Sequence, residues 1–470
     1  MYESDSVFLV NLIQGFRTDL CGGLEMAFGD IRVAERAEWL VDRIAATGSL
    51  VLRKLGGDLA GERSVGRFLS SPYVSVNAIV ETLAARTAEQ CAGRRVLAVQ
   101  DTTEINFSRR DKKRRGFGPG GDGKTPGFFI HPVIAVDVES EAVVGLVDAT
   151  IWTRSSGRNP GRGNHAFAEK ESERWLMGCR AAAGVLRNSG AVTMVADRES
   201  DLYPLFAERP ADLDLIVRAA QNRKLENGCH LFDALNEAVL LGTTQVRVAP
   251  RGPGDKGRIA KVELRAGKVR IACPQAYCGK GLAQTIELTL VEAREVDVPQ
   301  GKAALHWRLF TTHAVDNAAQ ADEIVQLYRL RWRIEQTFRA LKSDGLALED
   351  SQVADAERMF NLAAMGLAGA VRTIQLVDAR DGSPRPASDV IDDELVPALL
   401  RISRSLEGNT ARQKNHHHPN SLAFVAWIAA RLGGWNCYYK PPGPKTMRDG
   451  WNQLAAMLQG YALATNRENP

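Results

Sequence analysis

The sequence predicts an α/β protein in which a mixed sheet lies between helical segments at both ends of the chain. Three observations lead to this fold class. Helical periodicity dominates the first 90 residues, short apolar strands alternate with helical stretches over 96–218, and helical periodicity returns after residue 318. Residues 219–315 carry alternating segments separated by glycine, proline and charge, which predicts an antiparallel β insertion.

The first part of the chain is predicted to be helical. Apolar residues recur at helical spacing over 33–55, and Ser75 is positioned to cap a helix over 76–86. This part also carries four basic residues, Arg53, Lys54, Arg63 and Arg67. A solvated helix face explains such charges without any ligand, and the sequence pattern alone favours that interpretation.

Five short strands are predicted in the central part. They cover residues 96–100, 132–138, 143–152, 192–196 and 213–218. A helix over 167–186 separates the third strand from the fourth, and a second helix separates the fourth from the fifth. This order of elements is that of a ribonuclease H-like mixed sheet.

The charge balance of the chain is nearly neutral. Its 60 Lys and Arg residues against 56 Asp and Glu give a formal net charge of +4, and 44% of the residues are hydrophobic. This composition excludes a disordered or fibrous chain and a histone-like polybasic binder. It does not exclude a nucleic-acid enzyme, because binding follows the local distribution of charge.

Signals for export, membrane insertion and disulfides are weak. The N-terminus is acidic where a secretory signal would be basic, and the apolar run 362–371 has about half the length of a membrane span. The seven cysteines are odd in number and scattered, and Cys273 and Cys278 lack a second close pair to complete a zinc site. We expect a bacterial cytoplasmic protein without a membrane partner.

Residues 118–125 match the phosphate-loop pattern G-x4-G-K-[ST]. That loop works only between a buried strand and a helix. The preceding residues, 108–115, are too basic for a buried strand, and the following ones predict a turn and then a strand. We therefore expect no bound nucleotide here, only a glycine-rich connection whose basic flank could face phosphates.

Two aspartates come directly after predicted strands. Asp101 follows the strand 96–100, and Asp197 follows the strand 192–196. Such positions lie at the carboxyl edge of a sheet, where α/β proteins place their sites. An aspartate in either position can equally be a helix cap or a turn residue.

A third acidic residue lies in the helical segment 328–342. At about 100° per residue, five polar side chains fall within a sector of about 80°. They are Tyr328, Arg331, Glu335, Arg339 and Lys342. A surface ladder of salt bridges is the alternative, but a carboxylate that holds a divalent metal, beside cations for phosphates, explains all five positions.

These residues carry a family signature. Tyr328, Arg331, Glu335 and Lys342 fit the pattern Y-(2)-R-(3)-E-(6)-K, and the chain resembles the DDE transposases of insertion-sequence family four. Further matches lie at residues 66–69, 97–103, 169–172, 197–199, 217–218, 331–335 and 430–434, so the resemblance runs nearly from end to end.

The resemblance implies a catalytic triad of Asp101, Asp197 and Glu335 that binds two Mg²⁺ ions, with Mn²⁺ as a substitute. Oxygen ligands from separate elements suit such hard octahedral ions. It also implies a cut-and-paste reaction, in which transposon ends are nicked, closed into hairpins, reopened and joined to target DNA. All of these steps are phosphoryl transfers, so no organic cofactor is needed.

The resemblance also implies contacts with DNA. A tryptophan of the β insertion stacks on a flipped base in the related transposases, and Trp307 lies at the matching position, although a core tryptophan is the alternative. Arg218 and Arg223 match cations near that base. The flipped base's phosphate and the neighbouring backbone would be held by Tyr328, Arg331 and Lys342.

The chain departs from the family pattern at three places. Arg339 stands where the relatives have lysine, which keeps the charge and changes the donor geometry. His416, His417 and His418 replace a basic loop, and we expect a polar surface loop there in preference to a metal site. Residues 109–129 match poorly, so they carry no assigned DNA contact.

The resemblance assigns roles to the predicted domains. These are a helical DNA-end-recognition domain at 1–75, in which Arg53, Lys54, Arg63 and Arg67 contact the terminal repeat; a ribonuclease H-like core at 76–218 and 316–375; a β insertion at 219–315; and a helical dimerisation domain at 376–470. The apolar helices 421–432 and 451–464 suit a partner helix, so a homodimer on double-stranded DNA, associated with the nucleoid, is expected.

Two other functions remain open from the residues. A structure-selective nuclease of the same fold would cut DNA without joining it, and a non-catalytic DNA-binding regulator would do neither. The complete set of three acids argues against the regulator.

Overall fold

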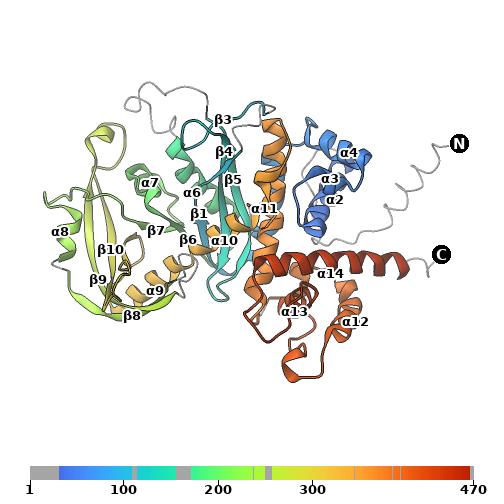
Figure 1. Cartoon of the computed structure of the whole chain (residues 1–470). Helices are drawn as coiled ribbons and strands as arrows, with labels where there is room; N and C mark the ends of the chain where they lie inside the picture. Colours follow the sequence, from blue (N-terminus) through green and yellow to red (C-terminus); the bar gives the residue numbers. More distant parts are fainter. Residues whose placement is uncertain are drawn as a thin grey trace.

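The computed structural model describes residues 31–107, 114–154, 171–236, 238–248, 257–342, 345–383, 385–391 and 393–465. Figure 1 shows a central sheet with a long antiparallel extension on one side and helical segments on the other. One helix, α11 (Ala356–Ala379), runs between the sheet and the N-terminal helices.

Five strands form the core of the sheet: β1 (Arg95–Gln100), β4 (Pro126–Asp137), β5 (Val143–Trp152), β6 (Ala191–Ala196) and β7 (Asp214–Arg218). β4 pairs antiparallel with both β5 and β1, whereas β1, β6 and β7 are parallel neighbours. The resulting order, β5-β4-β1-β6-β7, is a mixed sheet that fits the predicted ribonuclease H-like fold. The short strands β2 (Thr103–Asn106) and β3 (Gly118–Pro119) pair with the start of β4.

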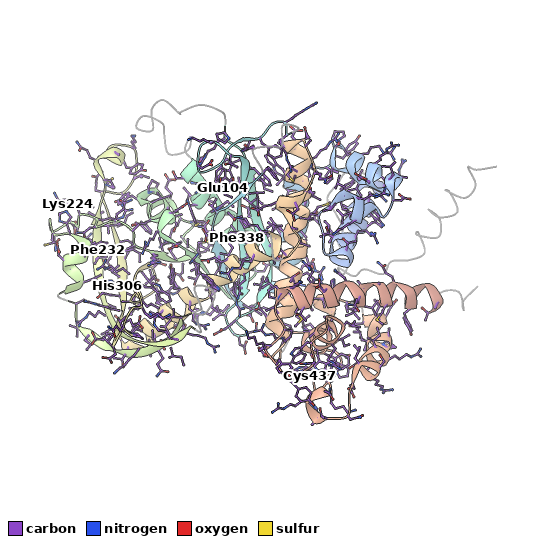
Figure 2. The ribbon with its side chains drawn as sticks, in the orientation of Figure 1. Glu104, Lys224, Phe232, His306, Phe338 and Cys437 are labelled. Atoms are coloured by element: carbon purple, nitrogen blue, oxygen red, sulfur yellow. The ribbon has the colours of Figure 1, made fainter. Side chains whose placement is uncertain are left out.

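Both faces of this core are covered, which explains why its strands are almost continuously apolar. In β1, Leu97 and Val99 belong to the cluster that includes α5 (Val76–Cys91) and α11, whereas Val96 and Ala98 belong to the cluster that includes α6 (Arg174–Val185). Successive strand residues point to opposite faces, so each face receives every second side chain. Side chains fill the space around the sheet (Figure 2), and the labelled Phe338, on the helix α10 (Trp332–Leu341), is buried in the cluster that includes α11.

Four antiparallel strands continue the same sheet beyond β7. They are β8 (Leu240–Val248), β9 (Arg258–Ala272), β10 (Thr285–Val296) and β11 (His306–Thr311). β11 pairs antiparallel with β7, with Phe310 opposite Val217, so core and extension share one ladder of hydrogen bonds. Two helices pack on the extension, α8 (Leu231–Asn236) and α9 (Ala318–Arg329).

The N-terminal helices are α2 (Ile31–Thr47), α3 (Leu52–Gly56), α4 (Leu59–Leu69) and α5 (Val76–Cys91). The helical spacing over 33–55 is interrupted after α2, where Gly48 has a positive φ of 56°. α3 and α4 touch closely, because a Cβ on Gly56 would lie 2.2 Å from the backbone nitrogen of Glu62. Ser75 caps α5 by accepting from the Ala78 amide at 3.2 Å, as the sequence predicts.

The C-terminal helices are α12 (Val396–Leu406), α13 (Leu422–Leu432) and α14 (Pro444–Thr465). Every residue of α13 from Leu422 to Ala430 is buried, and α13 packs against α11, α12 and α14. In α14, Trp451, Leu454 and Leu458 are also buried. Most of the apolar residues that made these helices suited to a partner therefore pack inside their own chain, whereas Met457 of α14 is 48% exposed.

The helix α11 is long and apolar enough to cross a membrane by length and composition alone. In this structure 78% of its most apolar stretch is buried, and its residues contact α2, α5, α10 and β5. Burial of this kind is typical of a central helix in a folded core.

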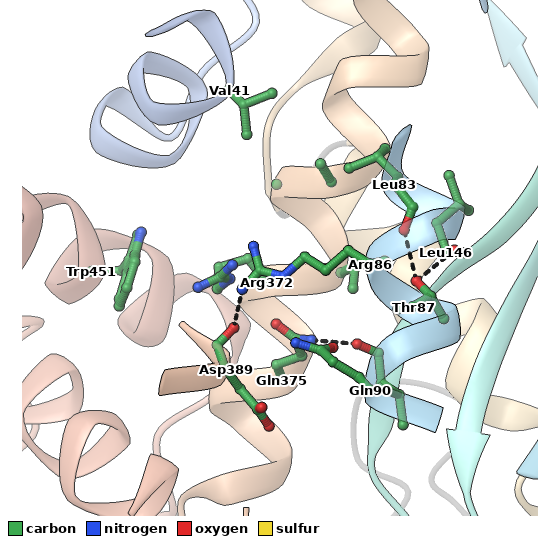
Figure 3. A pocket seen from close by; sticks show the side chains of 15 residues that line it. Val41, Leu83, Arg86, Thr87, Gln90, Leu146, Arg372, Gln375, Asp389 and Trp451 are labelled. Atoms are coloured by element: carbon green, nitrogen blue, oxygen red, sulfur yellow. Dashed lines mark hydrogen bonds between the residues drawn. The ribbon is translucent and has the colours of Figure 1, made fainter. Parts of the chain in front are cut away.

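A shallow hollow that opens to solvent lies where α2, α5, β5 and α11 meet the C-terminal segment. Two arginines cross this region (Figure 3): Arg86 donates to the Asp389 carbonyl at 2.7 Å, and Arg372 donates to the Val390 carbonyl at 2.9 Å. These bonds tie α5 and α11 to the chain that leads into α12. None of the predicted site residues lines the hollow.

Candidate active site

Asp101 and Asp197 lie side by side at one edge of the sheet. Each follows one of the parallel neighbours β1 and β6, in which Val99 is paired with Val195. Both aspartates therefore lie two residues beyond the same paired row. The strands end here because the chain turns: Asp197 begins a short turn in which its carbonyl accepts from the Ser200 amide at 3.0 Å.

The third acid, Glu335, is in the first turn of α10 (Trp332–Leu341). The prediction of one continuous helix over 328–342 is wrong, because α9 ends at Arg329 and a tight turn at Leu330 and Arg331 precedes α10. In this turn the Arg331 amide donates to the Tyr328 carbonyl at 3.0 Å. Tyr328 and Glu335 thus come from two helices that meet at Arg331.

The guanidinium of Arg331 joins the three acids. It lies 2.8 Å from Asp101 Oδ2, 2.6 Å from Glu335 Oε1 and 3.9 Å from Asp197 Oδ2, and its side chain is only 12% exposed. Two further groups approach Asp197: the Tyr328 hydroxyl donates to Oδ1 at 3.2 Å, and Arg218 lies 3.7 Å from the same oxygen. We call Asp101, Asp197 and Glu335 the acid cluster.

The acid cluster is electrostatically unbalanced. Burial, with smaller contributions from the charges of Asp197 and Glu335, raises the pKa of Asp101 to about 6, against the opposing effects of Arg331 and the Thr102 amide. Burial disfavours the charged guanidinium of Arg331, but Tyr328, Asp197, Asp101 and Glu335 together raise its pKa above the usual range. Three carboxylates around one buried cation are a site with spare negative charge.

The acids are not spaced for a metal ion as they stand. Within the described ranges, no three His, Cys, Asp or Glu side chains are close enough together to hold one ion. The contacts of Arg331 with all three carboxylates explain this spacing, since the guanidinium lies where a shared cation would be.

Trp307 is next to the acid cluster. It is half-buried on β11, and its ring centroid lies 5.1 Å from that of Tyr328 in an edge-on arrangement with an interplanar angle of 72°. Because Tyr328 itself bonds to Asp197, the indole is one side chain away from the carboxylate. The structure thus brings this predicted residue to the site.

Arg223, predicted to contact DNA, is instead a buried structural residue. Its guanidinium is 6% exposed and forms an ion pair with Asp201, whose side chain is fully buried, at 2.6 Å. The same carboxylate also accepts from the amides of Ala220 and Gln221 at 2.8 and 3.0 Å. Arg223 therefore holds the chain after β7 in place and presents no charge to a ligand.

Among the described residues, Arg339 and Lys342, the other two cations predicted to lie on the same helix face as Glu335, do not form ion pairs with the acid cluster as Arg331 does. Arg339 is exposed, and its guanidinium carbon lies 5.3 Å from the ring centroid of Trp332. Lys342 follows α10 and is half-buried. Burial lowers the pKa of Lys342, and its acidic neighbours are Glu349 and Glu104. Among the described ion pairs, that of Glu335 is with Arg331 and not with Arg339 or Lys342.

The four N-terminal cations lie apart from the acid cluster. Arg53 and Lys54 are exposed on α3, and Arg63 and Arg67 are exposed on α4. These helices lie on the far side of α11 from the sheet (Figure 1). Any role of these residues is therefore in a separate surface.

The glycine-rich segment is a strand connection. Its backbone forms a turn between β3 and β4, with the Gly120 amide bonded to the Thr125 carbonyl at 2.7 Å, and the strand β4 follows where a phosphate loop would have a helix. Residues 108–113, which belong to its basic flank, lie outside the described residues. His416, His417 and His418 lie on a surface loop, where the Nε2 of His416 is 2.7 Å from the Ala411 carbonyl.

Sequence patterns missed one group of residues beneath the acid cluster. Gln100, Thr102, His131 and Arg174 are connected by hydrogen bonds at the ends of β1 and α6. The signal that could have found them is a single histidine within the strand 126–137, whose other buried positions are nearly all apolar.

A mixed sheet with carboxylates at the ends of two neighbouring parallel strands, and a third on a helix after the last strand, defines a class of enzymes that act on nucleic acids. The family model of the transposase DDE domain matches residues 93–370, which is more than half of the chain. The chain belongs to the DDE transposases. These enzymes act on DNA and generally use divalent metal ions.

Proposed function

We propose that this chain is a cut-and-paste DNA transposase of insertion-sequence family four, similar to the transposase of the composite transposon Tn-five. It would bind the terminal inverted repeats of its element, cleave by nicking and hairpin formation, and join the 3′ ends to target DNA. The observation that carries the proposal is the convergence of Asp101, Asp197 and Glu335 around Arg331, with Tyr328 and Trp307 alongside.

Asp101, Asp197 and Glu335 would hold two divalent ions, proposed as Mg²⁺ with Mn²⁺ as a substitute, and these ions supply activation of the attacking oxygen and stabilisation of the leaving oxygen. The donor set fits, because carboxylate oxygens are the ligands that hard cations prefer. The three carboxylates share one buried guanidinium, that of Arg331, so the acid cluster has an excess of negative charge that supports the same assignment. Binding of the ions requires Arg331 to leave the carboxylates.

The cations and aromatic groups around the acid cluster would hold the DNA. Arg331, released from Asp101 and Glu335, is positioned to bind a phosphate bidentately. Arg218 lies beside Asp197 and is 21% exposed, so it can reach a phosphate next to the one that reacts. Trp307 presents a half-buried indole on which an extrahelical base can stack, an interaction typically worth about 1–3 kcal/mol.

Two further parts of the proposal concern assembly and location. The ends would be paired in a homodimer, in which each subunit cuts the end bound chiefly by the other, and the protein would act in the bacterial cytoplasm on the nucleoid. The exposed cations of α3 and α4 support a separate end-recognition surface, because they lie away from the acid cluster.

The test uses a duplex that ends in the inverted repeat read from the DNA flanking the gene, a target plasmid and Mg²⁺. We expect nicking, a hairpin and joined products, and loss of all three in Asp197→Asn. Cutting without joining would instead establish the structure-selective nuclease. Binding without cutting would establish the DNA-binding regulator.

A further inference from the structure

Beneath the acid cluster, a chain of hydrogen bonds connects the loops that carry Asp101 and Asp197. Arg174, the first residue of α6, donates from Nε to Thr102 Oγ1 at 3.0 Å and from Nη2 to Glu199 Oε2 at 3.1 Å. Thr102 follows Asp101 directly, and its amide donates to Asp101 Oδ1 at 2.8 Å. Glu199 lies in the turn that begins at Asp197. One guanidinium therefore contacts both loops.

A donor and an acceptor can be assigned to every hydrogen bond in this series. Gln100 Oε1 can only accept, so the neutral His131 donates to it from Nε2 and accepts at Nδ1 from the Thr102 hydroxyl at 2.9 Å, while the Thr102 oxygen accepts from Arg174. The distance from His131 Nε2 to Gln100 Oε1 is 3.2 Å. The amide nitrogen of Gln100 is left to donate to the Trp175 carbonyl, at 3.2 Å.

The far end of this hydrogen-bond chain is buried, so the bonds that His131 and Gln100 make with each other and with the Trp175 carbonyl are difficult to exchange for water. His131 is 1% exposed and Gln100 is fully buried, and burial holds the pKa of His131 well below its usual range, so that the imidazole is neutral. Arg174 is 14% exposed. The side chain of Gln100 also needs a glycine at position 178, because a Cβ on Gly178 would lie 2.4 Å from Gln100 Oε1.

The two contacts of Arg174, with Thr102 and with Glu199, differ in strength. The Glu199 carboxylate is 70% exposed, and such a pair contributes little to stability. The contact with Thr102 belongs to the hydrogen-bond chain and fixes the residue next to Asp101. A loss of Arg174 would leave the Thr102 hydroxyl without its donor and free both loops to shift, and active-site geometry is sensitive to shifts of this kind.

We propose that Arg174 is a positioning residue that sets the spacing of Asp101 and Asp197 through Thr102 and Glu199, with His131 and Gln100 as its buried support. This inference rests on the proposed function, because it concerns the carboxylates assigned to catalysis there. Arg174 itself touches none of the three acids in the contacts described above.

The test compares the full-length wild type with Arg174→Ala and with Arg180→Ala. Arg180 is a matched control on the same helix, where it forms an exposed ion pair with Glu208 at 3.2 Å. Binding of Mn²⁺ is measured by calorimetry without DNA, and nicking is measured with Mg²⁺ and corrected for the folded fraction. Loss of a partner of this kind typically costs about 10–100-fold in metal affinity or activity, so we expect such losses in Arg174→Ala and none in Arg180→Ala.

A second pair of variants separates positioning from folding. Thr102→Val removes the hydroxyl and keeps the shape, whereas Thr102→Ser restores the hydroxyl. We expect Thr102→Val to reproduce the weakened Mn²⁺ binding of Arg174→Ala, and Thr102→Ser to recover most of it, at similar melting temperatures.

The outcomes are distinguishable. Wild-type Mn²⁺ affinity in Arg174→Ala, or a fall in melting temperature with unchanged affinity and rate per folded molecule, overturns the positioning role. A wild type that binds Mn²⁺ but does not nick DNA overturns the proposed function, while its Mn²⁺ affinity still decides the role of Arg174. A wild type that binds no Mn²⁺ overturns both.

Discussion

Arg331 donates to a carboxylate oxygen of Asp101 at 2.8 Å, although the two residues are 230 positions apart in the sequence. The same guanidinium contacts Glu335 four residues further on. It is thus the counter-ion of a site whose acids come from three separate elements, and it competes with any other cation for the same oxygens.

Competition of this kind makes a prediction about Arg331→Ala. A hydrogen bond to a charged group contributes about 1.5–3 kcal/mol, so removal of the guanidinium should tighten Mn²⁺ binding by about tenfold or more in calorimetry. Nicking should nevertheless fall, because a phosphate ligand is lost. Weaker Mn²⁺ binding would show that Arg331 holds the carboxylates in place and does not compete for them.

Asp101→Asn should separate stability from activity. The pKa of Asp101 is raised from its ordinary 3.8 to about 6 in the folded chain, so folding disfavours the ionised form. The contribution of this group to stability is therefore greatest below pH 4 and is lost as the pH rises through 6. Without divalent ions, the free energy of unfolding from urea denaturation should be higher in Asp101→Asn than in the wild type by roughly 1–3 kcal/mol at pH 8. At pH 4 the two proteins should have similar free energies of unfolding. Nicking should be abolished; equal stability at pH 8 would contradict the burial of this carboxylate.

Trp307→Ala should impair hairpin formation by about tenfold, from the typical strength of base stacking, and nicking by less. Trp307→Phe keeps an aromatic face against Tyr328 and should retain most of the activity. The nicked strand and the hairpin are separated and quantified on denaturing gels. Trp435→Ala serves as the control, because Trp435 bonds to the Lys440 carbonyl in the C-terminal part. Equal losses of nicking and hairpin would make Trp307 a packing residue.

The arginines after β7 should respond in opposite ways. Arg223→Ala leaves the buried Asp201 carboxylate without its partner and should lower the free energy of unfolding by about 3–5 kcal/mol. Arg218→Ala should lower it by less, about 0–1 kcal/mol as for a loose, solvent-accessible ion pair, because Arg218 is partly exposed and lies 3.7 Å from Asp197, and it should weaken nicking. Urea denaturation and a nicking assay measure the two effects. A stable Arg223→Ala would contradict the buried ion pair.

Cysteine labelling tests the packing of α6 on the sheet. Burial raises the pKa of Cys91 and of Cys179 to about 12, so neither thiol forms a thiolate at pH 8. Cys229 and Cys278 are exposed. Iodoacetamide on the native chain, followed by peptide mass mapping, should modify the exposed pair and spare the buried pair. Rapid modification of Cys179 would show that α6 separates from the sheet.

The sequence predicted the parts of the site that depend on local pattern. Apolar runs that end in Asp101 and Asp197 located two strand ends, and the parallel pairing of β1 and β6 brings those ends together. The break at Leu330 escaped prediction because the backbone there stays close to helical, with φ −67° and ψ −14°, and no glycine or proline marks it.

Other features depend on contacts that no local pattern encodes. Arg218 and Arg223 are five positions apart and chemically identical, and only the placement of Asp201 decides which of them is buried. For α13, the spacing of apolar residues shows that the helix must be buried against other elements. It does not show that these elements are α11, α12 and α14 of the same chain.

The shared ladder between β7 and β11 has a consequence for how the protein is made. Strand β7 gains its second neighbour only after residue 311 has been synthesised, and Glu335 follows later still. Polypeptides that stop short of α10, through nonsense codons or stalled ribosomes, lack the third carboxylate and the arginine beside it. A cell that carries the gene would therefore produce no fragment ending before α10 with the complete acid cluster.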